Sequence, residues 1–218
     1  MSTTYQYRPR AVAFLDVLGF RQKLNEFQTE AETFFSESSQ SDDPEAPSPV
    51  YFSQKAHDFI ETFKQAVSKL DSDAFSYFLF SDNICITGKD EQTERSLIDL
   101  IMVITELYFE FAKKGYFLRG AIDFGLFVDE ETLAIGTPLA TAYELETTAA
   151  VFPRIVLSSN FVKQFEKYYR ESTLAFDDLL VSTLINRNCE ISYLNVFSQI
   201  FKTDDKEEFL ASYQQKIV

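Results

Sequence analysis

The sequence predicts a mixed α/β sandwich, an α+β arrangement with a ferredoxin-like βαββαβ core. Short apolar runs typical of strands alternate with longer amphipathic segments typical of helices, in the order β-α-α-β-β-α-β-α-β. The chain has 218 residues, of which 45% are hydrophobic, which is enough for a substantial core. We therefore expect one domain over 1–218, without internal repeats.

The first half of the chain is expected to supply three strands and two helices, interrupted by an insert. The first strand is nearly all apolar, which indicates burial on both faces, and the second helix carries an apolar stripe. In order, we expect a strand at 10–15, a helix at 18–28, a mobile acidic Ser/Pro-rich insert at 29–50, a helix at 51–70, and hairpin strands at 74–80 and 83–88.

The second half continues the alternation. Lys113, Lys114 and Gly115 form a typical helix C-terminus, and Pro138 is typical of a helix start. In order, we expect a helix at 92–114, a strand at 117–128 broken by Gly125, a helix at 138–149, a strand at 154–158, a helix at 159–169, a strand pair within 178–197, and a polar helix at 205–216.

Composition excludes several classes of function. The formal net charge is −14, which would repel the phosphate backbone of nucleic acid. No apolar run approaches the roughly 20 residues that span a bilayer, and the first residues do not resemble a signal peptide. Cys85 and Cys189 are expected in the core rather than in a disulfide. These features predict a cytoplasmic protein without nucleic-acid or membrane partners.

Two aspartates stand out because each follows an apolar run. Asp16 ends the first predicted strand, and Asp82 lies at the turn of the predicted hairpin, near the end of that strand. Carboxylates in such surroundings need a positive partner. Their hard oxygen atoms favour Mg²⁺ or Mn²⁺, which usually accompany a triphosphate. In the alternative interpretation, Asp16 caps the following helix and Asp82 is an ordinary turn residue.

Several motifs resemble class III nucleotidyl (adenylate/guanylate) cyclase homology domains, in the order in which those domains carry them. Within this group, the motifs most resemble those of the small bacterial pyrimidine cyclases of the Pycsar antiphage system. The similar strings are Asp-Val-Leu-Gly-Phe from Asp16, Phe-Ser-Asp ending at Asp82, Leu-Arg-Gly-Ala-Ile from Leu118, Ala-Tyr-Glu-Leu-Glu from Ala142, and Pro-Arg-Ile-Val from Pro153.

The resemblance implies a nucleotide cyclase that makes a 3′,5′-cyclic monophosphate and pyrophosphate from UTP or CTP, with UTP favoured. It implies a homodimer with shared active sites, and a separate effector that the cyclic nucleotide activates in antiphage defence. Two Mn²⁺ or Mg²⁺ ions per site would be held by Asp16, Asp82 and the carbonyl of Val17. Gly19 and Phe20 would offer backbone N–H groups to the triphosphate, or else simply form a strand-to-helix turn.

The chain departs from the purine cyclases at four positions. The places of their catalytic Asn and Arg hold Ala140 and Glu144, and the places of their adenine-reading Lys and Asp fall near Phe78 and Leu133. The missing arginine predicts a cation placed elsewhere or a dead enzyme. An adenylate or guanylate cyclase with altered base contacts, and a catalytically dead binding module, are the alternatives.

Three further residues are candidates for the site. Arg119 and Arg154 lie in apolar strands and would stabilise charge on the phosphates. The alternative is a structural ion pair with Asp123, Glu144 or Glu146. Only one of Tyr77 and its neighbour Phe78 can face the cleft, and the hydroxyl of Tyr77 would hydrogen-bond a pyrimidine. Core packing is the alternative, and Tyr5 or Tyr7 could supply the ring instead.

Overall fold

The computed structural model describes residues 5–38, 50–89, 94–130, 133–171, 184–188 and 191–197. The chain divides into a sheet unit (Met1–Leu18 with Leu70–Val218) and a helical unit (Gly19–Lys69). Cys189, the predicted terminal helix, half of the predicted insert and the start of the predicted strand pair lie outside the described residues.

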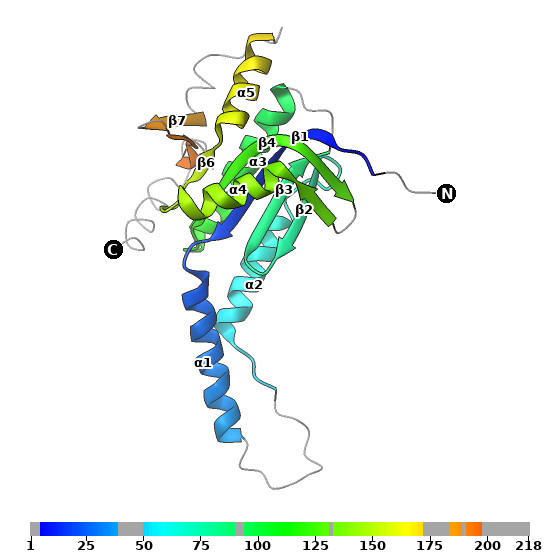
Figure 1. Ribbon diagram of the computed structural model, residues 1–218. Helices are drawn as coiled ribbons and strands as arrows, with labels where there is room; N and C mark the ends of the chain where they lie inside the picture. Colours follow the sequence, from blue (N-terminus) through cyan, green and yellow to red (C-terminus); the bar gives the residue numbers. More distant parts are fainter. Residues whose placement is uncertain are drawn as a thin grey trace. The chain divides into compact units, whose positions relative to one another are not determined.

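An eight-stranded sheet forms the sheet unit (Figure 1). Its strands are β1 (Arg8–Val17), β2 (Phe75–Phe80), β3 (Asn83–Gly88), β4 (Leu118–Glu130), β5 (Leu133–Gly136), β6 (Ile155–Leu157), β7 (Ile185–Asn188) and β8 (Ile191–Leu194). Their order is β2-β3-β1-β4-β6-β8-β7, and β5 pairs with β4. The antiparallel set β2-β3-β1-β4 is the ferredoxin-like arrangement that the sequence predicts.

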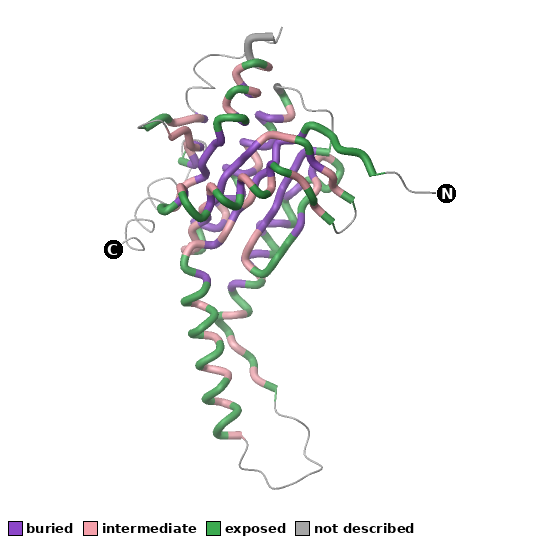
Figure 2. Tube along the Cα trace, viewed as in Figure 1, coloured by how far each residue is buried: buried purple, intermediate pink, exposed green. Residues whose placement is uncertain are grey.

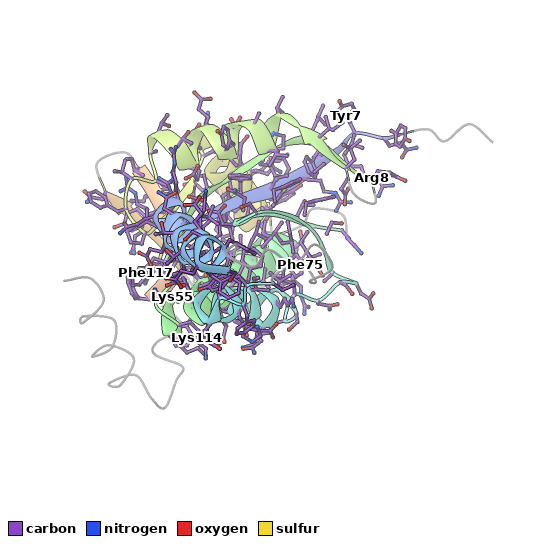
Figure 3. The ribbon with its side chains drawn as sticks, turned by 90° about the horizontal axis from the view of Figure 1, so that it is seen from below. Tyr7, Arg8, Lys55, Phe75, Lys114 and Phe117 are labelled. Carbon is purple, nitrogen blue, oxygen red and sulfur yellow. The ribbon has the colours of Figure 1, made fainter. Side chains whose placement is uncertain are left out.

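Strand β1 is the centre of the sheet, and Figure 2 shows it buried along most of its length. Ala11, Val12, Ala13 and Leu15 are fully buried, because β1 is flanked by β3 and β4 and its side chains alternate between two covered faces. The strand runs from Arg8 at one end of the sheet to Val17 at the other. Figure 3 labels Arg8 and, beyond the start of β4 at the opposite end, Phe117.

Three helices belong to the sheet unit: α3 (Glu94–Lys113), α4 (Thr137–Thr148) and α5 (Ser159–Glu171). Helix α4 lies on the face of the sheet that carries Phe14, whose ring meets that of Tyr143 edge-on at 5.5 Å. On the same face Ala142 packs with Ala121 of β4. We call this surface, with Asp16 two residues further along β1, the α4 face. Helices α3 and α5 contact each other and the sheet.

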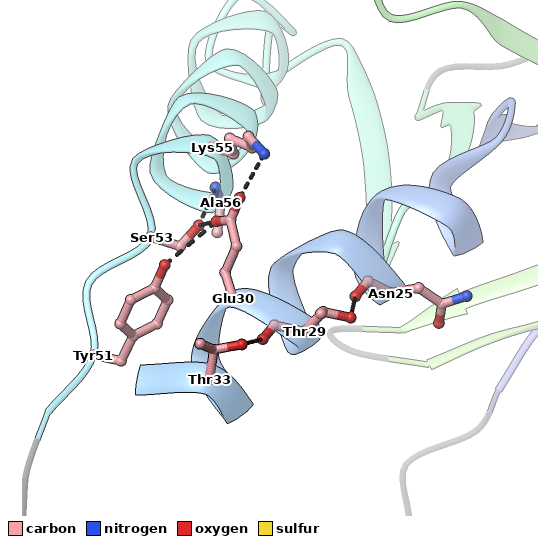
Figure 4. Close-up of polar contacts among 8 residues, drawn as sticks. All are labelled: Asn25, Thr29, Glu30, Thr33, Tyr51, Ser53, Lys55 and Ala56. Atoms are coloured by element: carbon pink, nitrogen blue, oxygen red, sulfur yellow. Dashed lines mark hydrogen bonds and ion pairs between the residues drawn. The ribbon is translucent and has the colours of Figure 1, made fainter. Parts of the chain in front are cut away.

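The helical unit is a pair of helices, α1 (Phe20–Ser38) and α2 (Gln54–Val67). Figure 4 shows Glu30 of α1 accepting hydrogen bonds from Tyr51, Ser53 and Lys55, the last at 2.5 Å. Helix α1 ends ten residues later than predicted, so the expectation of a mobile insert from residue 29 is wrong as far as Ser38. Intrahelical contacts such as Thr29 to Asn25 continue the helix there.

Two details of the predicted β4 region are wrong. The strand is not broken at Gly125, since β4 continues to Glu130. A side chain at Gly125 would lie 3.1 Å from Thr137 and 3.2 Å from Pro138, so glycine here lets the start of α4 approach the strand. Strand β5 is not predicted from the sequence. No helix in the described ranges combines the length and hydropathy needed to cross a bilayer.

Candidate active site

Asp16 and Asp82 meet at one end of the sheet. In the register of β1, Asp16 lies opposite Asn83 of β3, and Asp82 is the preceding residue in the two-residue turn between β2 and β3. Ser81, the other turn residue, adopts the left-handed region at φ 58°, which is uncommon for a residue other than glycine. The turn therefore places Asp82 at the end of the strand that neighbours Asp16.

The carboxyl groups of the two aspartates interact directly. Burial, followed by a hydrogen bond to Asp16 and the negative charge of Asp16, raises the pKa of Asp82 to about 6. Two partly buried carboxylates that lie this close repel each other, so a proton or a cation between them is favoured. This close approach is what the sequence-based metal hypothesis requires.

Arg119 of β4 lies on the other side of Asp16, directly opposite it in the register of the two strands. Its Nε donates a hydrogen bond to Oδ2 of Asp16 at 2.9 Å, and the same Nε lies 2.7 Å from Oε1 of Glu146. Of the alternatives from the sequence, an ion pair with Glu146 is therefore present. The Nη1 and Nη2 groups of Arg119 donate no hydrogen bond to the described residues.

Glu146 of α4 belongs to the site as well, although the sequence indicates it only as a possible ion-pair partner of an arginine. Its side chain is only 3% exposed. Pro138, Ala142 and Glu146 form the buried stripe of α4 at i, i+4 and i+8, so the helix brings Glu146 to Arg119 just as it brings Ala142 to Ala121. That spacing was a usable signal, because an acid on a buried stripe needs a cation.

The surroundings of Glu146 oppose its negative charge. Burial is the largest cause that raises its pKa, with Asp16 and Asp82 adding to it, whereas the positive charge of Arg119 lowers it. Among the described residues, Oε1 of Glu146 receives no properly directed hydrogen bond despite its short distance from Arg119. The cluster thus contains three acids and one arginine.

Arg154 lies beside Arg119 but is not part of this ion-pair cluster. The carbonyl of Arg154 accepts a hydrogen bond from the backbone N–H of Gly120, while its Nη2 donates to the carbonyl of Ala149 at the end of α4, at 2.5 Å. Its guanidinium also lies over the ring of Phe152, 5.9 Å from the centroid. These contacts anchor the C-terminus of α4.

Tyr77 and Phe78 occupy opposite faces of the sheet. Phe78 pairs with Cys85, packs in the buried cluster with Val12 and Phe127, and so lies on the α4 face. Strand alternation places Tyr77, which is 37% exposed, on the other face, away from Asp16. The structure thus does not bring the predicted base reader to the aspartates.

The remaining predicted site residues follow Asp16 in the chain. Val17 is buried at the end of β1. Gly19 adopts φ 76°, and its carbonyl accepts the first hydrogen bonds of α1, from Gln22 and Lys23. Gly19 and Phe20 belong to the helical unit. Their role as a phosphate cradle stays a prediction.

The donor set fits a hard divalent cation. Asp16 and Asp82 offer converging carboxylate oxygen atoms, and burial together with the neighbouring Asp16 raises the pKa of Asp82, so a cation that bound both acids would relieve their repulsion. No cluster of three or more His, Cys, Asp or Glu side chains suited to a metal ion occurs among the residues in the described ranges. Substrate oxygen atoms and water would therefore have to complete the coordination.

Comparison with known proteins gives matches at the level of structure. No protein-family profile and no curated protein sequence matches the chain. The catalytic core of a rhodopsin-guanylyl cyclase with converted specificity, in complex with ATPαS, has a TM-score of 0.50 at 12% identity, over 75% of this chain and 84% of that one.

Two further solved structures are similar. The guanylyl cyclase domain of the RhoGC fusion protein from the aquatic fungus Blastocladiella emersonii has a TM-score of 0.50 at 10% identity, over 88% of this chain and 96% of that one. A bacterial light-regulated adenylyl cyclase has a TM-score of 0.52 at 9% identity, over 100% of this chain and 60% of that one. This chain therefore has the mixed α/β fold of adenylyl and guanylyl cyclase domains.

Proposed function

We propose that this chain is a pyrimidine nucleotide cyclase that converts UTP, or alternatively CTP, to the 3′,5′-cyclic monophosphate and pyrophosphate. One observation carries the proposal: in a cyclase fold, the carboxyl groups of Asp16 and Asp82 meet beside the guanidinium of Arg119. Paired acids and an adjacent arginine are the groups that phosphoryl transfer on a triphosphate needs.

In this proposal Asp16, Asp82 and the carbonyl of Val17 hold two Mg²⁺ or Mn²⁺ ions. When bound, these ions neutralise the triphosphate and make the ribose 3′-hydroxyl a better nucleophile. The residues themselves would fix where the triphosphate lies, because Asp16 lies in β1 and Asp82 in the tight turn of the β2–β3 hairpin that pairs with it.

Arg119 would bind the phosphate oxygen atoms through Nη1 and Nη2, which donate no hydrogen bond to the described residues. The 3′-oxygen forms a bond to the α-phosphorus, the bond from that phosphorus to the β-phosphate oxygen breaks, and pyrophosphate leaves. The 3′-hydroxyl proton goes to solvent. Arg154, whose carbonyl accepts a hydrogen bond from the N–H of Gly120 next to Arg119, would add positive charge as the pyrophosphate forms. For this role its Nη2 would have to leave the carbonyl of Ala149.

The base preference rests on Phe78. The sequence resemblance places Phe78 near the adenine-reading lysine of the purine cyclases, and here that side chain is buried in an apolar cluster on the α4 face. The phenylalanine ring is bulky and cannot hydrogen-bond the base, so it disfavours a purine, whose recognition requires a polar group at this position. Phe78 therefore favours a pyrimidine base, with UTP and CTP equally compatible.

The proposal includes a homodimer with shared active sites. Apolar side chains are exposed on the β4–β5 hairpin and on α4, including Leu126, Leu133, Ile135 and Tyr143, each of which is 48% to 56% exposed. Such side chains are enriched where protein surfaces associate. The cyclic nucleotide would act on a separate effector in antiphage defence, as the sequence resemblance implies.

An adenylate or guanylate cyclase is the second candidate, because the solved structures with a similar fold are guanylyl and adenylyl cyclases. A dead binding module is the third, since Glu144 stands where purine cyclases carry an arginine. The retained pair of Asp16 and Asp82 argues against a module that binds only a partner protein, because such a module gains nothing from two acids that destabilise each other.

One experiment separates these candidates. The full chain is incubated with ATP, GTP, UTP or CTP and Mn²⁺, and the products are separated by chromatography. A cyclic pyrimidine product supports the proposal, and a dominant cyclic purine product supports the second candidate. Absence of any cyclic product, together with a divalent-dependent thermal shift, supports the binding module.

A further inference from the structure

The Nε–H of Arg119 faces two carboxylates at once. It lies 2.9 Å from Oδ2 of Asp16 and 2.7 Å from Oε1 of Glu146, but its geometry as a hydrogen bond is directed at Asp16. A single N–H group makes one well-directed hydrogen bond. Glu146 therefore attracts the guanidinium by charge, while Asp16 holds its proton.

Asp16 is also the acid on which the proposed cation site depends. A divalent cation and the guanidinium of Arg119 would compete for the same carboxylate, and each would repel the other at such distances. Without another anion to retain it, a guanidinium in this place would be driven away from a loaded site. The loaded site would then lose a cation next to its substrate.

Glu146 is suited to retain that guanidinium. It is fixed on the buried stripe of α4, four residues after Ala142, which itself packs on β4. The side chain has little access to solvent, so it cannot turn away to be hydrated. Its charge is opposed by burial and compensated by Arg119, so Glu146 and Arg119 favour staying together.

We propose, building on the proposed function, that Arg119 occupies Asp16 in the cation-free state, and that Glu146 is the positioning residue that retains Arg119 when a divalent cation takes Asp16. The exchange moves the Nε–H from Asp16 to Glu146. It leaves Nη1 and Nη2 facing the phosphates and keeps the guanidinium beside the cations.

The first test measures Mn²⁺ binding to the full chain by calorimetry, without nucleotide. Wild type is compared with Arg119→Ala, Glu146→Gln and the double variant. Loss of the competing guanidinium is expected to raise the Mn²⁺ affinity about tenfold in Arg119→Ala. In the Arg119→Ala background, Glu146→Gln is expected to lower the Mn²⁺ affinity only through the lost negative charge. In wild type it is expected to lower the affinity further, because Arg119 then stays on Asp16.

This cycle separates positioning from a simple effect of charge. If Glu146 acts only through its charge, Glu146→Gln changes the Mn²⁺ affinity by the same factor with arginine or alanine at position 119. If Glu146 retains Arg119, that factor is at least threefold larger with arginine. Glu144→Gln is the matched control, because it removes the same charge from an exposed position on the same helix. It is expected to change the Mn²⁺ affinity less than twofold.

The second test uses inorganic tripolyphosphate, which has no base, in saturating Mn²⁺. Arg119→Ala and Glu146→Gln are each expected to weaken its binding about tenfold, and the double variant no more than Arg119→Ala alone. If Glu146→Gln does not fold, Arg119→Lys replaces it. Lysine keeps the competing charge and should keep the wild-type Mn²⁺ affinity, but it should weaken tripolyphosphate because it lacks the planar pair of donors.

The inference is overturned if Arg119→Ala leaves the Mn²⁺ affinity unchanged or lower, or if Glu146→Gln has equal effects in both backgrounds. Neither measurement depends on turnover. If Arg119 competes with Mn²⁺ for Asp16 but no cyclic product forms, only the proposed function is rejected. A cyclic product with no such competition would reject only this inference.

Discussion

Arg119 and Asp16 face each other across β4 and β1, with Nε of the arginine 2.9 Å from Oδ2 of the aspartate. The strand register makes this contact, since these two residues are directly opposite partners. The same register places Asn83 on the other side of Asp16, and with it the turn that carries Asp82. One strand end thus gathers groups that are 66 and 103 positions from Asp16 in the sequence.

Asp16→Asn and Asp82→Asn are each expected to abolish the cyclic product while keeping the fold, because each removes a charged ligand but no packing volume. The Mn²⁺-dependent rise in melting temperature should also disappear in both variants. Product is measured by chromatography, and the fold by circular dichroism. Asp129→Asn is the control, an acid at the other end of the sheet that accepts a hydrogen bond from Ser76. Turnover that persists in either site variant would refute the metal assignment.

The stability of the cation-free protein should depend on Asp82. Its pKa is raised from 3.8 to about 6 in the folded protein, so between these values the folded state binds more protons than the unfolded state. The contribution of Asp82 to stability is then greatest below 3.8 and falls as the pH rises through about 6. Melting temperatures recorded in a chelator should therefore fall over this range more steeply for wild type than for Asp82→Asn.

The control for this pH dependence is Asp73→Asn, which removes an exposed acid before β2. It should keep the wild-type slope. If Asp82→Asn and Asp73→Asn have the same slope as wild type, Asp82 does not titrate in this range.

Gly120, which follows Arg119, should not tolerate a side chain. A Cβ there would lie 2.3 Å from the carbonyl oxygen of Phe14 and 2.8 Å from Cδ2 of Leu15, so β1 and β4 would have to separate. Gly120→Ala is expected to cost about 3 kcal/mol in the free energy of unfolding, as overpacking does. Urea denaturation measures it.

Gly19→Ala is the matched comparison. Its φ of 76° disfavours alanine, but no atom lies within 4 Å of the added Cβ. The expected cost is about 1 kcal/mol, from the backbone alone. Equal losses at the two glycines would contradict the steric argument.

Tyr77→Phe tests the predicted role of Tyr77 in base recognition. If its hydroxyl hydrogen-bonds the base, the KM for UTP rises about tenfold, whereas a side chain on the face away from Asp16 leaves KM unchanged. We expect an unchanged KM, because strand alternation puts Phe78 and not Tyr77 on the α4 face. Steady-state kinetics with UTP and CTP decide between the two.

The homodimer can be tested on the β5 hairpin. Ile135→Glu places a charge on an exposed apolar position and should shift sedimentation from dimer to monomer, with loss of turnover if the sites are shared. Lys114→Glu, an exposed change of charge beyond α3, should remain dimeric. A monomeric wild type with full activity would refute the shared-site proposal.

Local sequence patterns predict the order of the elements in the described ranges, apart from β5. The apolar run at 10–15, the hairpin at 74–88 and the amphipathic helices all appear where local periodicity predicts them, because burial and alternation are properties of short segments. Asp16 and Asp82 were also visible, since a carboxylate at the end of an apolar run is unusual wherever the strand lies. Local signals were weaker for the end of α1 and for β5. Strand β5 has only four residues, which alternate between exposed and half-buried, so none of them is buried.

Which of these residues lie together depends on contacts between segments that are distant in the sequence. The pairing of β1 with β4 chose Asp16 as a partner of Arg119, and the packing of α4 on the sheet added Glu146, whereas Arg154 turned to the end of α4. Face assignment separated Tyr77 from Phe78. These outcomes depend on register and on packing between distant segments, and because a shift of one residue reverses every face, no local pattern fixes them.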